Sequence, residues 1–316
     1  RRQRQMCIRD SLISTFSDHW DKGRFSDSKW DKVINVDTTT LDQLINDYGY
    51  PKYIKIDVEG LDHFGNTVVS QVIEEKPLTI YLNSQEIVTA MTIGDYPEYL
   101  AVGFLKNQGM LDSLNPVISV DYDDDLAVVV VRTESETSFE EKLKKKTRTS
   151  GCAVGTVFGD MMEGLEGLKL PTSPLRISWL YDLSNKINRT PSLYLAAGAI
   201  HGTVLCQENK ALVYMEDVGR HNAVDKIAGW MDSHNVSGSD KILYTTGRLT
   251  SEMVIKTAQM GIPILVSRSG FTAWGAEIAV KVNLTLIGRM RGQRFTCLSG
   301  SDRLIWDVDG ENGDDK

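Results

Sequence analysis

Cysteine is scarce in this 316-residue chain, and its placement excludes two common roles. The four cysteines lie far apart and form no CxxC pair: Cys7, Cys152, Cys206 and Cys297. Such spacing fits neither a small disulfide-bonded scaffold nor a closed zinc site. We expect a reducing, cytoplasmic setting, which also suits the chemistry of a free thiol.

Long apolar runs and an excess of positive charge are also missing. The longest apolar run, Leu126–Val131, is far too short to cross a membrane, and no apolar segment of signal-peptide length follows the basic first residues. The net charge of -8 argues against general nucleic-acid binding, which depends on clustered Lys and Arg. We therefore expect neither a membrane nor a nucleic acid as partner.

The first sixty residues differ in pattern from the rest. They show a β-α-β pattern: an apolar strand at Val33–Val36, a helix over residues 38–49, and a second strand, YIKIDVEG, that ends in a glycine turn. The segment Val33–Gly60 resembles part of an FkbM-type methyltransferase. No glycine-rich cofactor loop precedes it, so we expect no methyl transfer. The string MCIRDS, Met6–Ser11, is similar to a translated sequencing adapter.

The expected organisation is a non-native leader, a methyltransferase-like fragment, a main domain and a tail whose acidic C-terminal end is disordered: residues 1–12, 13–63, 64–300 and 301–316. In the main domain, PLTIYLNSQEIVTAM predicts a hairpin that turns at Asn83–Ser84, and VISVDYDDDLAVVVVR predicts a second one. Asp95 is expected to cap a helix over Pro97–Asn107, which ends before Gly109. A short basic helix is expected after Ser138.

The C-terminal half alternates between strand and helix. Apolar strands are predicted at Ile242–Thr246, Ile264–Val266 and Thr285–Ile287, with helices at Thr250–Met260 and Ala273–Val282 between them. Such βαβ alternation predicts a largely parallel sheet with helices on its faces. Ligands of these sheets tend to bind beyond the carboxyl ends of the strands.

Cys152 is the main candidate for chemistry. It lies in the glycine-rich string SGCAVGTVFG, after a basic run at Lys144–Lys146 and Arg148. Positive charge nearby lowers the pKa of a thiol and favours the reactive thiolate, and glycine lets the backbone move. The pattern suits a nucleophile that moves between a donor and an acceptor. A small buried hydrophobic side chain, the usual fate of a free cysteine, fits the sequence equally well.

A second cluster, YMEDVGRHNAVDK, joins an apolar strand at Leu212–Met215 to a helix through a glycine. A strand, a glycine turn and a helix start expose backbone N–H groups and a positive dipole end to an anion. Four residues crowd this turn, Glu216, Asp217, Arg220 and His221, and His221 is a candidate general acid or base. The alternative is helix capping with an Asp217–Arg220 ion pair.

Two further clusters contribute arginines. In TTGRLTSEM, Thr250 is expected to cap a helix and Glu252 to suit its positive end, while Arg248 faces either a ligand or solvent. The string RMRGQR places three guanidinium groups at the end of a strand: Arg289, Arg291 and Arg294. Guanidinium groups bind phosphate well, although a solvated basic loop is as consistent with this spacing.

Together these segments resemble the FdhD family of formate dehydrogenase accessory sulfurtransferases, from about Phe64 to Cys297. The matching strings follow the family's order: EEKPLTIYLNSQEI, SGCAVG, AAGAIHGTVL, MEDVGRHNAVDK, TTGRLTSEMVIKTAQMGIPILVSRSGFTAWGAEIA and LTLIGRMRGQRF. The string EDVGRHNAVDK in this order is highly specific.

The resemblance implies a carrier that takes sulfur, as a cysteine persulfide, from a cysteine desulfurase. It passes the sulfur to the molybdenum bis(pyranopterin guanine dinucleotide) cofactor that formate dehydrogenase needs. The implied fold is a cytidine-deaminase-like mixed α/β sheet with flanking helices and a smaller N-terminal subdomain rich in β-hairpins. A homodimer is implied, and neither a permanently bound cofactor nor a metal is expected. Cys152 matches the persulfide-carrying cysteine. The cofactor-binding candidates are His201, Asp217, Arg220, His221, Arg248, Arg289, Met290, Arg291, Gly292, Gln293 and Arg294.

One position departs from the family pattern. Gly155 stands where many members carry a second cysteine, and a neighbouring thiol can release a persulfide sulfur as sulfide. We therefore expect transfer through Cys152 alone. Among alternatives, a zinc deaminase would need H-x-E and P-C-x-x-C ligand motifs, which are missing. A non-catalytic cofactor chaperone, in which Cys152 is incidental, stays open.

Overall fold

The computed structural model describes residues 2–8, 14–15, 32–38, 58–61, 67–70, 73–111, 114–135, 148–150, 154–157, 165 and 167–308. The chain divides into two compact units, Arg1–Glu74 and Glu75–Lys316. Within the described ranges, no helix combines the length and the apolar character that a membrane crossing requires.

The first unit contains short antiparallel pairings. Its strands are β1 (Arg2–Ile8), β2 (Ser14–Thr15), β3 (Lys32–Thr38), β4 (Val58–Leu61) and β5 (Thr67–Ser70). β1 pairs with β2 and β3, and β4 pairs with β5. The predicted strand Val33–Val36 lies inside β3, whereas the predicted helix over residues 38–49 lies outside the described residues. The turn predicted at Gly60 is wrong, because Gly60 continues β4 and pairs with Val68.

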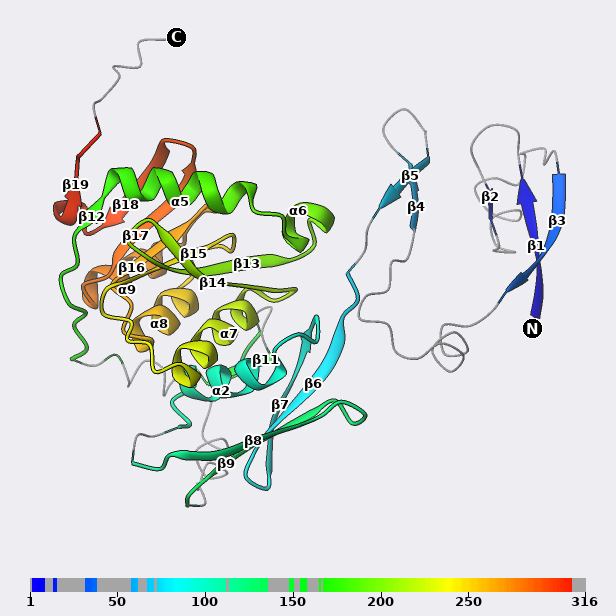
Figure 1. The fold of residues 1–316 in the computed structure, drawn as a ribbon, viewed down its shortest axis with the longest axis horizontal. Coiled ribbons are helices and arrows are strands. Elements are labelled where there is room, and N and C mark those ends of the chain that lie inside the picture. The colour runs from blue at the N-terminus through cyan, green and yellow to red at the C-terminus, as the bar shows by residue number, and fades with distance from the viewer. Residues whose placement is uncertain are drawn as a thin grey trace, which may run out of the picture. The chain divides into compact units, whose positions relative to one another are not determined.

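The second unit begins with a four-stranded sheet of order β7-β6-β9-β8 (Figure 1). Its elements are β6 (Lys76–Leu82), β7 (Gln85–Thr92), α2 (Pro97–Asn107), β8 (Val117–Asp123) and β9 (Val128–Thr133). Both predicted hairpins are confirmed. Leu78, Ile80 and Leu82 alternate with more exposed residues along β6, as expected of a strand with one buried face. That face packs against α2.

The predicted cap of α2 is wrong, although the bounds of the helix are confirmed. The N-cap residue is Tyr96, with φ 48°, and no side chain caps the helix. The Asp95 carboxylate instead forms an ion pair with Lys226. A fully buried ammonium group without carboxylate partners is far more costly than an uncapped N–H at the surface. The burial of Lys226 therefore explains the position of Asp95.

The main sheet has six strands in the order β14-β13-β15-β16-β17-β18. They are β13 (His201–Gln207), β14 (Lys210–Asp217), β15 (Lys241–Thr245), β16 (Ile264–Ser267), β17 (Thr285–Arg291) and β18 (Arg294–Ser299). β15, β16 and β17 are parallel neighbours, as predicted, while β13–β14, β13–β15 and β17–β18 are antiparallel. The sheet is therefore mixed.

Helices cover both faces of this sheet (Figure 1). They are α5 (Ile177–Arg189), α6 (Leu193–Ala197), α7 (Arg220–Ser233), α8 (Ser251–Gln259) and α9 (Ala273–Lys281). α5 packs on one face, and α7, α8 and α9 pack on the other. The layers follow from the sequence, because apolar strand residues on both sides need cover from water.

Two more pairings complete the second unit. β10 (Arg148–Ser150) and β11 (Val154–Val157) form an antiparallel pair. β12 (Leu175–Arg176) pairs with β19 (Leu304–Ile305), which follows the short 3-10 helix η1 (Ser301–Arg303). The predicted tail thus begins with ordered structure, and its last residues, 309–316, lie outside the described residues. The basic helix predicted after Ser138 lies outside them as well.

The contact between α2 and α7 joins the two sheets of the second unit. A Cβ atom on Gly103 of α2 would lie 1.7 Å from the backbone oxygen of Asp225, and one on Gly229 of α7 would lie 2.0 Å from that of Tyr99. Asn107 of α2 donates a hydrogen bond to the Asp225 carboxylate at 2.7 Å. The two helices therefore touch backbone to backbone beside a buried polar contact.

Candidate functional site

The topology places most of the predicted binding residues along one edge of the main sheet. β14, β15, β16 and β17 run in the same direction, so their carboxyl ends share this edge, where β13 and β18 begin. We call it the strand-end edge. In sheet order it carries Asp217, His201, Arg248, Arg289, Arg291 and Arg294, and Arg220 and His221 follow β14. These segments lie at the carboxyl ends of the strands, and that a ligand binds there stays a prediction.

Three helices begin at the strand-end edge, α7, α8 and α9, and the first two lack a side-chain cap. α7 starts after Gly219 and α8 after Thr250, and neither N-cap residue makes a side-chain cap bond. Thr250 is the N-cap residue, as predicted, but its Oγ1 is buried without a partner, so the predicted capping bond is wrong. The N-terminus of a helix carries free N–H groups and partial positive charge. The edge therefore presents three such ends, and that of α9 is capped by the Thr272 side chain.

Arg220 is a buried cation without a counter-ion in the described part of the chain. Its residue is 7% exposed and its Nε has no hydrogen-bond partner. The Asp217–Arg220 ion pair considered as an alternative is wrong, because no carboxylate among the described residues lies within ion-pairing distance of Arg220. A Cβ on Gly247 would lie 2.9 Å from the Arg220 Cβ, so glycine makes room for Arg220. A buried unpaired charge is costly, and an anionic ligand would offset that cost.

Asp217 supports the turn rather than facing outward. It is completely buried and accepts hydrogen bonds from Thr92 Oγ1, from Gly219 N at 3.1 Å and from Asn222 Nδ2 at 2.9 Å. It also forms an ion pair with Lys226 Nζ at 2.6 Å. With its carboxylate oxygens engaged in this way, Asp217 acts on a ligand only through the turn that it holds.

The two histidines of the site are poor proton donors at neutral pH. His221 is 2% exposed, and burial, with smaller contributions from Lys256, Arg220 and His201, lowers its pKa to about 2. Its Nε2 lies 3.1 Å from Glu252 Oε2, yet neither ring nitrogen is aligned for a hydrogen bond. Burial, Arg220 and Arg248 lower the pKa of His201. A lowered pKa disfavours His221 as a general acid at neutral pH, and its role as an acid or a base stays a prediction.

The string RMRGQR forms the end of β17, the tip of a hairpin and the start of β18. A β-bulge lies between Gly288 and Arg291, where Arg289 has φ 56° and its N–H donates to Ser269 O at 2.8 Å. Bulges redirect side chains and often occur beside functional sites. The Arg289 guanidinium lies 5.2 Å from the centre of the Phe271 ring. The exposed tip consists of Arg291, Gly292, Gln293 and Arg294.

Met290 differs from its neighbours in this string. Its side chain is completely buried in the core beneath α5. Because the whole residue is 0% exposed, neither the side chain nor the backbone of Met290 faces a ligand at this edge.

Arg268 is a site residue that sequence reasoning missed. It directly follows β16, and its guanidinium lies 5.6 Å from the centre of the Tyr194 ring of α6. Its position just after the predicted strand Ile264–Val266 could have indicated that it lies at the strand-end edge. Within the described ranges, none of six arginines at this edge forms an ion pair: Arg220, Arg248, Arg268, Arg289, Arg291 and Arg294. In an acidic chain this gathers unpaired positive charge at one place.

Cys152 lies outside the described residues. The strands on either side of it in the sequence, β10 and β11, pair with each other, and β11, which contains Gly155, lies beside β7. Two other cysteines can be compared. Cys206 is completely buried, and burial raises its pKa to about 12. Burial also raises the pKa of the half-buried Cys297. Neither environment favours a thiolate.

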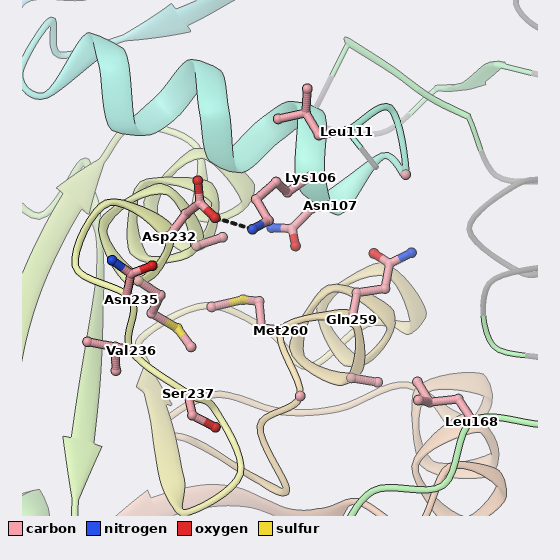
Figure 2. Close-up of a pocket in the computed structure, with 15 residues that line it drawn as sticks. Lys106, Asn107, Leu111, Leu168, Asp232, Asn235, Val236, Ser237, Gln259 and Met260 are labelled. Atoms are coloured by element: carbon pink, nitrogen blue, oxygen red, sulfur yellow. Dashed lines mark hydrogen bonds and ion pairs between the residues drawn. The ribbon is translucent and has the colours of Figure 1, made fainter. Parts of the chain in front are cut away.

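A separate cavity of about 700 Å³ lies near the C-terminal ends of α2, α7 and α8 (Figure 2). Lys106 and Asp232 form an ion pair in its wall, and Gln259 and Met260 also line it (Figure 2). Because α7 and α8 begin at the strand-end edge, their far ends place this cavity away from the arginines. Among the described residues, no cluster of three His, Cys, Asp or Glu residues could hold a metal ion.

The chain is similar in sequence to proteins of known family. The chain is 31% identical over 241 residues to the sulfur carrier protein FdhD of Listeria monocytogenes serovar 1/2a, which covers 75% of this chain and 92% of that protein. It is 29% identical over 240 residues to the sulfur carrier protein FdhD of Bacillus subtilis strain 168, with 75% and 91% covered.

A solved structure is also similar. It is a crystal structure of a protein described as a formate dehydrogenase accessory protein, from Desulfotalea psychrophila, with a TM-score of 0.65 and 26% identity. The match covers 80% of this chain and 99% of that one. The FdhD/NarQ family model matches residues 73–305, which confirms the family expected from the sequence. The chain therefore belongs to the FdhD/NarQ family.

Proposed function

We propose that this protein is a sulfurtransferase that carries sulfur on Cys152 to a guanine-dinucleotide form of the molybdenum cofactor. The observation that carries the proposal is the row of unpaired arginines along the strand-end edge, in a member of a family whose relatives are named sulfur carrier proteins. The acceptor belongs to the formate dehydrogenase system, and a cysteine desulfurase is the donor. We also expect the chain to act as a homodimer in the cytoplasm.

The charges of the site fit the acceptor's phosphate groups. Among the described residues, Arg220 is buried without an anion, and the N-termini of α7, α8 and α9 lie at the same edge. Phosphate groups bind to helix N-termini and to guanidinium forks. A charge-assisted hydrogen bond of this kind contributes about 1.5–3 kcal/mol. Several such contacts would therefore hold a dinucleotide without a resident metal ligand in the protein.

The sulfur step needs only one thiolate in this chain. The Cys152 thiolate attacks the outer sulfur of the donor's persulfide, so a new S–S bond forms at Cys152. The donor's own S–S bond breaks, and the donor leaves as a thiolate. No external oxidant is required. With Gly155 at the second position, no neighbouring thiol at that position can attack the Cys152 persulfide and release sulfide.

A persulfide assay tests this role of Cys152. The full chain is incubated with a cysteine desulfurase and cysteine, and its peptides are measured by mass spectrometry without reduction. We expect one added sulfur atom, a gain of about 32 Da, on the peptide that contains Cys152. Cys206 is the internal control, because its burial and raised pKa predict no added sulfur. An unmodified Cys152 would contradict the proposal.

A variant of Cys152 separates the carrier from a cofactor chaperone. The unpaired arginines would serve a non-catalytic chaperone equally well, so binding alone does not distinguish the two functions. Cys152→Ala should keep the affinity for a guanine nucleotide and fail to support formate dehydrogenase activity. Full dehydrogenase activity with Cys152→Ala would favour the chaperone.

A further inference from the structure

Arg268 and Tyr194 form an ordered pair at the strand-end edge. The Arg268 guanidinium lies 5.6 Å from the ring centre of Tyr194. The backbone N–H of Arg268 donates a hydrogen bond to the backbone oxygen of Thr245 at 3.3 Å. A guanidinium group that stacks on an aromatic ring keeps its N–H donors at the rim available. No carboxylate in the described part of the chain pairs with Arg268. The ring thus orients a guanidinium group that pairs with no carboxylate among the described residues.

Glu216 fixes the helix that carries Tyr194. The Glu216 carboxylate accepts hydrogen bonds from the backbone of Leu193 at 2.9 Å and of Tyr194 at 2.8 Å, both at the start of α6. The Tyr214 hydroxyl donates to the same carboxylate at 3.3 Å. Glu216 is the last residue but one of β14, so α6 is attached directly to the strand-end edge. The negative charge of Glu216 is engaged by α6 rather than by an arginine.

Arg268 completes a series of guanidinium groups. β15, β16 and β17 are adjacent strands, and neighbouring strands lie about 4.8 Å apart. Arg248, Arg268 and Arg289 follow or end these three strands in turn. Arg268 stacks on Tyr194 and Arg289 on Phe271, so aromatic rings orient two of the three.

We propose that Arg268 binds a phosphate group of the nucleotide part of the acceptor, and that Tyr194 and Glu216 position it. This inference rests on the proposed function and adds a binding residue and two positioning residues to it. Arg268 contacts the ligand, whereas Tyr194 acts through Arg268 and Glu216 acts through α6.

Calorimetric titration of the full chain with guanosine diphosphate, and separately with inorganic pyrophosphate, tests the inference. We expect Arg268→Ala to bind both about tenfold to a hundredfold more weakly, the range expected when one charge-assisted contact is lost. The matched control is Arg176→Ala. Arg176 lies 5.8 Å from the Trp179 ring at the start of α5, the far end of that helix from α6, and pairs with Asp307. This control should bind as the wild type does.

Further variants test the positioning role. Tyr194→Phe keeps the ring and should bind as the wild type does, whereas Tyr194→Leu and Glu216→Gln should each weaken binding about threefold to tenfold, within the energy of one cation–π contact. Melting temperatures recorded in parallel should stay close to the wild-type value, which separates positioning from loss of fold.

The outcomes are distinct. Unchanged affinity in Arg268→Ala overturns the inference and leaves the proposed function intact. Equal affinities of Tyr194→Leu and the wild type overturn the positioning role. A wild-type chain that binds neither probe overturns the nucleotide site and this inference with it.

Discussion

At the residue scale, charges that are paired in the interior contrast with charges that are unpaired at the strand-end edge. Lys256 is almost completely buried and contacts both oxygens of Asp225, at 2.8 and 2.6 Å. Lys226 is completely buried and pairs with Asp217 and Asp95. Buried pairs of this kind stabilise one arrangement because breaking either partner leaves a buried charge. The arginines of the edge have no such partner among the described residues, which suits binding.

His221 should make the protein sensitive to acid. Its folded-state pKa is about 2, below the ordinary value of 6.5, so the folded protein keeps it neutral while the unfolded chain takes up a proton below pH 6.5. The unfolded state then binds more protons, so stability is lost as the pH falls through 6.5 toward the folded pKa. Between pH 7 and pH 5 this one residue should cost about 2 kcal/mol of unfolding free energy.

Urea unfolding at pH 7 and pH 5 measures this loss. His221→Gln and His221→Met have no titrating ring, so either variant that folds should lose about 2 kcal/mol less than the wild type over the same interval. Identical losses in the wild type and both variants would show that His221 is protonated in the folded state as readily as in the unfolded chain.

The sequence predicted which residues of the candidate site lie together better than it predicted how their charges pair. Asp217, Arg220 and His221 were expected at one turn, and they lie there. The partners were missed because they are distant in sequence, as for Thr92 with Asp217 and Asp95 with Lys226. Local spacing favours an Asp217–Arg220 pair, but the Asp217 carboxylate pairs with the buried Lys226 instead. Which cation pairs with a given carboxylate depends on tertiary contacts, and local sequence patterns do not show these contacts.

At the element scale, the α2–α7 contact is the feature most sensitive to added volume. Alanine at position 103 or 229 would gain about 1 kcal/mol in helix propensity over glycine. The new Cβ, however, would lie 1.7 Å or 2.0 Å from a backbone oxygen, a distance that only separation of the helices relieves. We therefore expect Gly103→Ala and Gly229→Ala to lose about 3 kcal/mol or more of stability, at the upper end of overpacking.

Chemical denaturation checks this expectation, with Gly270→Ala as the control. A Cβ atom on Gly270 would meet no other atom within 4 Å, and the φ of Gly270 is not positive. The stability of this control variant should therefore change by less than about 1 kcal/mol. A Gly103→Ala variant as stable as the wild type would mean that the helices tolerate a wider separation.

Periodicity predicted the elements whose neighbours in space are also neighbours in sequence. Both hairpins of the four-stranded sheet and the parallel core β15-β16-β17 follow from strand and helix patterns, and they are confirmed. α5 was missed, although its apolar residues lie on one face of an otherwise polar helix. The antiparallel joining of β13 to β15 was also beyond local patterns, because it pairs strands separated by β14 and α7.

At the scale of the whole molecule, the family match and the compact units divide the chain at nearly the same place. The family model begins at residue 73, and the second unit begins at Glu75. The sequence placed the start of the main domain near Phe64, on the resemblance of its first strings. That the leader over residues 1–12 is non-native stays a prediction, and a continuous genomic reading frame through Gly60 would refute it.

A chain that begins at residue 73 should fold and work without the residues before it. The four-stranded sheet begins at Lys76, and α2 covers its inner face. Thr92, Asp95 and Asn107 make the polar contacts that join this part to α7 and β14, and all three lie well after residue 73. We expect the shortened chain to melt within a few degrees of the full chain, to bind guanosine diphosphate with the same affinity and to form the Cys152 persulfide. Loss of cooperative unfolding on removal of residues 1–72 would show that these residues stabilise the second unit. In that case the change in sequence pattern after about residue 60 would not mark a domain boundary.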